Sequence, residues 1–137
     1  MKKMHQLSVH GKWTLEFKNR ILHTQVSGPT NKEASDEWLE DALKVIELSD
    51  DCYEDPWVVI NDARDWEMAS LDFWESANDV IHFLEEKNCV LFVVVFSRKI
   101  HQYTLEKGLD DQSIVKLFGD YDEAYQACID KLAYQAG

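Results

Sequence analysis

Residues 61–70 combine acidic residues, an arginine, a tryptophan and a serine directly after a short apolar run that is typical of a buried strand. In open α/β sheets, ligands gather beyond the carboxyl ends of the strands, so this segment is a candidate binding site. Ser70 would expose its hydroxyl at the start of the next helix. Free backbone N–H groups and the helix dipole would stabilise a phosphate there, which makes Ser70 a candidate phospho-acceptor.

Cations follow two neighbouring apolar runs of the chain. Arg64 comes after the first run, and Arg98 and Lys99 come after the second. Arginine binds anionic groups through parallel N–H donors, so these side chains could hold an anion at one edge of a sheet. The candidate partner or ligand segment therefore consists of Asp62, Arg64, Asp65, Trp66 and Arg98.

Two other interpretations of this segment stay open. In the first, it is a plain connection closed by the packing of Trp66 and Met68, with Ser70 as an ordinary helix cap. In the second, the acids and the arginine of residues 62–65 form an enzyme site of unfamiliar type. We rank the enzyme last, because no motif supports it.

Aromatic residues suggest a different kind of site. Five tryptophans occur in the chain, at positions 13, 38, 57, 66 and 74. They could line a slot between helices that accepts a small apolar or amphipathic ligand. Core packing is the alternative use of most of these rings.

Familiar catalytic and cofactor motifs are missing from the sequence. The five glycines are scattered and form neither GxGxxG nor GxxxxGK[ST], and no GxSxG or HExxH occurs. The five histidines are dispersed, and no pair lies one helical turn apart. We therefore expect no catalytic residues, no cofactor and no metal.

Charge further restricts the function. The chain has 137 residues, with 14 Lys and Arg against 26 Asp and Glu, and a formal net charge of −12. Such a protein repels phosphate backbones and anionic lipid, so nucleic acid and membrane surfaces are poor partners. We expect a protein partner or a small apolar ligand, and a monomer or homodimer.

The location is expected to be cytoplasmic. No signal-peptide pattern follows Lys2 and Lys3, and the longest apolar run, residues 89–96, is far shorter than the about 20 residues of a membrane span. Cys89 and Cys128 fall on apolar stripes and are expected in the core. Cys52 lies among acids, which disfavour a reactive thiolate.

Periodicity predicts one α/β domain over residues 1–137, with a loose segment at 1–10. An alternating hairpin covers 13–17 and 21–26, and Gly28 and Pro29 break its second strand. The buried parallel strand 57–60, the central strand 90–96 and the last strand 114–118 follow. Helices separate these strands: one with Thr30 and Glu33 as a capping box, one capped by Ser70, one over 100–105 stopped by Gly108, and one capped at Asp120.

The resulting order, ββαβαβαβα, implies a mixed, mostly parallel sheet covered by helices. Together with the run Val58, Val59, Ile60 and Asn61 before a Ser-capped helix, and the ending over residues 115–124, this pattern resembles the STAS or SpoIIAA-like family. The resemblance spans residues 11–135. The family includes bacterial anti-sigma-factor antagonists and STAS-like proteins of unassigned activity.

The resemblance implies a regulatory role for one position. Antagonists carry a phosphorylatable serine or threonine in an Asp-Ser-Ser/Ala-Gly-like segment at the start of the second helix, and Ser70 matches it. Ala69 replaces the expected Asp, and Asp72 replaces the expected Gly. We therefore expect a non-enzymatic STAS-like regulatory or protein-interaction domain. The alternative is a binding module for a small apolar or amphipathic ligand.

Overall fold

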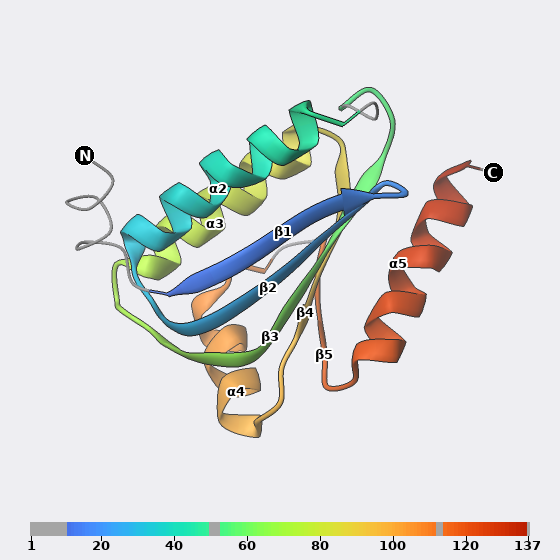
Figure 1. Cartoon of the computed structure of the whole chain (residues 1–137). Helices are drawn as coiled ribbons and strands as arrows, with labels where there is room; N and C mark the ends of the chain where they lie inside the picture. Colours follow the sequence, from blue (N-terminus) through green and yellow to red (C-terminus); the bar gives the residue numbers. More distant parts are fainter. Residues whose placement is uncertain (1–10, 50–52, 112–113, 137) are drawn as a thin grey trace.

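The computed structural model describes residues 11–49, 53–111 and 114–136. Its elements follow the predicted order ββαβαβαβα (Figure 1). Their bounds are β1 Lys12–Lys18, β2 Ile21–Thr30, α2 Lys32–Glu47, β3 Trp57–Ala69, α3 Phe73–Glu86, β4 Cys89–Val95, α4 Lys99–Gly108, β5 Val115–Phe118 and α5 Tyr121–Ala136. The expected loose segment 1–10 and Cys52 lie outside the described residues.

The five strands form one sheet in the order β1-β2-β3-β4-β5. β1 and β2 form the predicted antiparallel hairpin, and the other neighbours are parallel. Asn19 and Arg20 make the turn of the hairpin with φ values of 54° and 65°. Positive φ at both central residues is the requirement of a type I′ turn, whose twist matches the strands.

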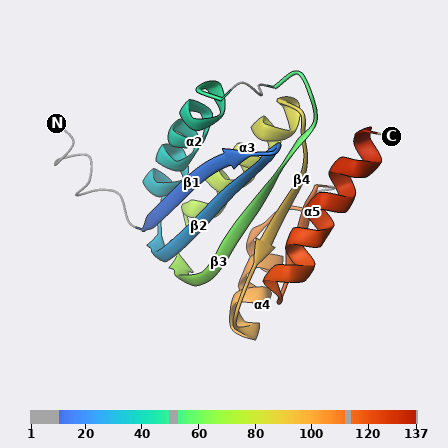
Figure 2. The ribbon, with the colours of Figure 1, turned by 45° about the vertical axis from the view of Figure 1, so that its right-hand side comes forward.

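Helices cover the two faces of the sheet unequally (Figure 2). α2 and α3 lie side by side on one face, and Leu105 of α4 joins the same core. α5 packs on the other face over β3, β4 and β5. Cys89 and Cys128 are both buried in these cores, as predicted.

The apolar runs of β3 and β4 are buried on both faces. Val59 faces α2 and α3, whereas Val58 and Ile60 face α5, and all three are at most 1% exposed. This two-sided burial explains why the parallel strands have continuous apolar sequences. β3 is the middle strand of the sheet, and β4, predicted as the central strand, lies between β3 and β5.

Two predicted strand ends are wrong. β2 continues through Gly28 and Pro29 to Thr30, because a register irregularity accommodates the proline, which has no N–H for the ladder. β3 does not end at Ile60 but continues through the predicted loop to Ala69, because residues 62–69 pair with β2.

Two predicted helix caps are also wrong. The N-cap of α2 is Asn31 instead of Thr30, and Asn31 Oδ1 accepts a 3.0 Å hydrogen bond from the N–H of Ala34. α3 begins two residues later than predicted, with Asp72 at its N-cap instead of Ser70. The predicted cap of α5 is confirmed, since Asp120 accepts a 2.9 Å hydrogen bond from the N–H of Glu123.

Candidate functional site

A bulge in β3 determines where Trp66 points. The partners of Asp62 and Asp65 in β2 are only two positions apart, so β3 has one extra residue between them. Val59, before the bulge, and Ala63, at its start, belong to the core beneath α2 and α3, and so does Trp66 after it. Strict alternation would have turned Trp66 to the opposite face, so the extra residue is what brings its ring to this side.

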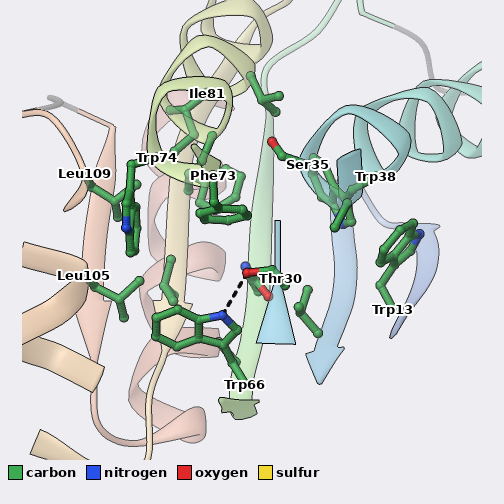
Figure 3. A pocket seen from close by; sticks show the side chains of 18 residues that line it. Trp13, Thr30, Ser35, Trp38, Trp66, Phe73, Trp74, Ile81, Leu105 and Leu109 are labelled. Carbon is green, nitrogen blue, oxygen red and sulfur yellow. Dashed lines mark hydrogen bonds between the residues drawn. The ribbon is translucent and has the colours of Figure 1, made fainter. Parts of the chain in front are cut away.

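Trp66 forms part of an apolar pocket between the sheet and helices α2, α3 and α4 (Figure 3). Trp13 and Trp38 line one side, and Phe73 and Trp74 line the other. The cavity is about 100 Å³, and the whole hollow with the solvent at its mouth is about 760 Å³. Four of the five tryptophans thus line one pocket, which lies between the sheet and the helices and not between helices alone.

Hydrogen bonds fix the orientation of these indole rings. Trp66 Nε1 donates to Thr30 Oγ1 at 3.1 Å, and Trp38 Nε1 donates to Thr24 Oγ1 at 3.0 Å. Trp13 Nε1 donates to a carboxylate oxygen of α2 at 3.0 Å. The N–H groups of these three rings are therefore paired within the protein, and the rings present apolar surface to the cavity.

Trp57 is the exception among the tryptophans. It is fully buried, and its ring meets that of Phe17 edge to face with a centroid separation of 6.0 Å. Its Nε1 donates to the carbonyl oxygen of Lys87 at 2.7 Å. For this residue, core packing was the correct interpretation.

The wall formed by α3 and α4 is held by an asparagine. Asn78 Nδ2 donates to the carbonyl oxygen of Gly108 at 3.1 Å, and Asn78 Oδ1 accepts from the N–H of Asp110 at 2.8 Å. The indole of Trp74 lies so close to Gly108 that a Cβ there would fall 2.2 Å from the ring. Trp74 also meets Trp66 edge to face, with centroids 6.1 Å apart.

Two buried polar atoms in this region have no hydrogen-bond partner among the described residues. One is Oδ1 of Asn61, a residue that lines the pocket. The other is Nδ1 of His101, whose ring centroid is 5.0 Å from that of Trp66. Asn61 is the first residue of the predicted segment 61–70, but its side chain was given no role there. The sequence does contain a clue: Asn61 directly follows the apolar run 57–60, and in a strand it points to the same face as Val59, where an apolar residue would be expected.

Arg64 is engaged away from the pocket. Its Nε and one terminal nitrogen each donate to Asp62 at 2.8 Å, and its guanidinium lies 5.2 Å from the ring centroid of Tyr121. The hydrogen bonds from Arg64 hold the pKa of Asp62 below its ordinary value. Burial raises the pKa of Tyr121. The positive charge that was predicted to hold an anion is therefore already paired with Asp62.

The residue before Arg98 contacts β3. Ser97 Oγ donates to the carbonyl oxygen of Arg64 at 2.9 Å, so the start of α4 adjoins β3. Arg98 is exposed at the N-cap of α4 and makes no ion pair with the described residues. Asp65 is exposed and lines a shallow depression with Lys12.

Ser70 is exposed just after β3. Its N–H donates to the carbonyl oxygen of Thr30 at 2.9 Å, and its hydroxyl donates to the carboxylate of Asp72. Met68 and Leu71 on either side are 65% and 95% exposed. In the part of the chain that the structure describes, Ser70 makes no bond to Arg64 or Arg98, so the predicted serine and cations are not joined in one site.

Within residues 11–49, 53–111 and 114–136, no group of three or more His, Cys, Asp or Glu side chains could hold a metal ion. In the same residues, no helix is long and apolar enough to cross a membrane.

Comparison with known proteins identifies the fold. No protein-family model matches the sequence, and no curated protein matches it significantly. An anti-sigma factor antagonist from Mycobacterium paratuberculosis is similar in structure, with a TM-score of 0.58 and 17% identity over 88% of this chain and 95% of that one.

A second similar structure is an uncharacterised DUF3478-family protein with a SpoIIAA-like fold from Shewanella loihica PV-4. It has a TM-score of 0.50 and 17% identity over 90% of this chain and 94% of that one. At this identity the likeness concerns the fold. The chain is a mixed α/β protein with the SpoIIAA-like, or STAS-like, fold, as predicted.

Proposed function

We propose that this protein binds a small apolar molecule in the pocket beneath α2, α3 and α4. The observation that supports the proposal is the lining itself: four tryptophans and two phenylalanines line one cavity, and none of its 18 lining residues is ionisable. Ligand sites are typically concave, apolar and equipped with few polar groups. A core that served packing alone would have few voids larger than a water molecule.

The size of the cavity limits the ligand. An apolar cavity of roughly 150 Å³ in another protein is large enough to bind benzene. With a cavity of about 100 Å³ that is open to solvent on one side, this pocket suits one aromatic ring or a short alkyl group, with any larger part of the ligand toward solvent. Rings such as Trp66 and Trp74 would contact it directly.

Toluene and naphthalene are suitable probes. Their binding can be monitored through the NMR chemical shifts of the backbone amide and indole N–H groups. We expect both compounds to shift the signals of Trp66 and Trp74, and Ala77→Phe to abolish the shifts because Ala77 lines the cavity. Ala133→Phe adds the same ring at an exposed position of α5 and serves as the control. Unchanged wild-type spectra up to the solubility limit would contradict the proposal, as would equal binding by the Ala77→Phe variant.

We propose as a second candidate a protein-interaction role for the exposed segment around Ser70. Met68 and Leu71 supply exposed apolar side chains on both sides of the serine hydroxyl. Phosphorylation would replace the hydrogen bond from Ser70 to Asp72 by repulsion between two anions, which would move the start of α3. The exposed side chains of Arg64, Asp65 and Arg98 extend this candidate surface.

Native mass spectrometry of the protein purified from its own host tests this role. We expect a phosphoryl-sized mass increase that maps to Ser70, and different affinities of Ser70→Asp and Ser70→Ala for the co-purifying protein. Thr14→Asp places the same charge on the exposed surface of β1 as a control. Equal binding by both Ser70 variants, with no modification in the host, would exclude phosphorylation control.

A further inference from the structure

We infer that the ligand of the aromatic pocket is a neutral molecule with one hydroxyl group, and that this group binds the side-chain amide of Asn61. The inference rests on the proposed ligand-binding function and specifies the chemistry of the ligand. It starts from a polar side chain in an otherwise apolar cavity.

Asn61 lies in the middle strand of the sheet. Its neighbours in register are Thr24 of β2 and Val94 of β4. It shares the alternation of Val59 and Ala63, which face α2 and α3, and it lines the pocket with Ala63 and Val94. Asn61 is half-buried and lies among apolar side chains, a setting in which an apolar residue is the usual occupant.

The amide of Asn61 has unused hydrogen-bonding capacity. Its Oδ1 is buried and has no partner among the described residues. The nearest hydroxyl in register, Thr24 Oγ1, accepts its hydrogen bond from Trp38, and Thr30 Oγ1 accepts from Trp66. Buried polar groups in folded proteins are nearly always paired, so this amide is suited to a partner that the folded chain itself does not supply.

The chemistry of the amide defines the group that it would bind. An asparagine side chain offers a carbonyl acceptor and an NH₂ donor, and a half-turn of the amide exchanges their places. A hydroxyl both donates and accepts, so it fits either orientation. A charged group does not fit, because none of the lining residues could neutralise it.

Phenol and toluene form a matched pair of probes, since they share the ring and differ in the hydroxyl. We expect Asn61→Leu, which keeps a similar size, to weaken phenol binding about fivefold to tenfold, the range of one neutral hydrogen bond. The same variant should bind toluene at least as tightly as the wild type. In the wild type, phenol and not toluene should shift the side-chain NH₂ signals of Asn61.

The possible outcomes separate the inference from the function on which it rests. If Asn61→Leu changes the binding of phenol and of toluene equally, or changes neither, the inference is overturned. The proposal that the pocket binds apolar molecules then still stands. Binding of neither compound to the wild-type protein overturns both. A thermal melt of Asn61→Leu as cooperative as that of the wild type ensures that the comparison concerns binding and not unfolding.

Discussion

The indole Nε1 of Trp66 donates a 3.1 Å hydrogen bond to Oγ1 of Thr30, a residue 36 positions earlier in the chain. The bond joins the end of β2 to the part of β3 that follows the bulge (Figure 3). Trp66 is 5% exposed and Thr30 is 4% exposed, so the pair is shielded from water. This bond sets the orientation of the ring that closes one end of the pocket.

Thr30→Val should therefore destabilise the protein by about 1–3 kcal/mol, because a buried indole N–H would lose its acceptor while the shape of the side chain is kept. Urea denaturation measures the change. Thr14→Val on the exposed face of β1 is the control, and its effect should stay within about 0.5 kcal/mol. Equal effects of the two variants would show that the hydrogen bond contributes nothing.

Local patterns were sufficient to predict most of the fold. The apolar runs at Val58 and Val93 and the helical stripes through Trp38 and Ile81 each repeat within a few residues, so a single sequence reveals them. The end of β3 depends instead on pairing with β2. Residues 62–67 are mostly polar and resemble a loop, and only the ladder to a distant strand makes them extended.

The pocket was predictable in composition but not in geometry. The number of tryptophans indicated an aromatic slot, yet the side to which Trp66 points depends on an extra residue in β3 that no local pattern reveals. Similarly, Thr30 and Asn31 are adjacent residues that both favour helix caps. Asn31 is the cap, because its Oδ1 accepts from the N–H of Ala34, whereas the hydroxyl of Thr30 accepts from Trp66 on the next strand.

Gly108→Ala tests the contact between α4 and Trp74. Alanine normally stabilises a helix relative to glycine, but here its Cβ would lie 2.2 Å from the indole of Trp74. The ring must move, and we expect a loss of about 1–3 kcal/mol in unfolding free energy together with altered fluorescence of Trp74.

The matched control is Gly119→Ala, whose Cβ would meet Phe96 at an ordinary 3.5 Å. It should leave stability and fluorescence close to those of the wild type. A Gly108→Ala protein that is more stable than the wild type would mean that α4 moves freely away from Trp74.

Ser76→Ala tests the link between α2 and α3. Ser76 Oγ donates to Asp36 at 2.7 Å, and this bond, with the nearby Lys32, holds the pKa of Asp36 below its ordinary value. Such a group stabilises the fold above its unfolded pKa of about 3.9 and loses this contribution as the pH falls through the folded pKa. Ser76→Ala should therefore lower the unfolding free energy more at neutral pH than at a pH below the folded pKa of Asp36.

Carboxyl NMR titration gives the direct measurement. In Ser76→Ala the pKa of Asp36 should rise toward its ordinary value. The pKa of Asp62, which depends on Arg64, should stay unchanged and acts as the internal control. If the pKa of Asp36 does not change in Ser76→Ala, its low value is due to Lys32 and not to Ser76.

Cys89 and Cys128 should be unreactive in the folded protein. Cys89 is 1% exposed and Cys128 is fully buried, and burial raises the pKa of each thiol to about 12. Because the thiolate is the nucleophile, a Cys52→Ala variant should react with Ellman's reagent at pH 8 only as fast as it unfolds. Adding Thr14→Cys, on the exposed surface of β1, to this variant should give one promptly reacting thiol. Prompt labelling without that addition would mean that α5 separates from the sheet in the native state, because Cys128 is covered only while the helix is packed on β3, β4 and β5.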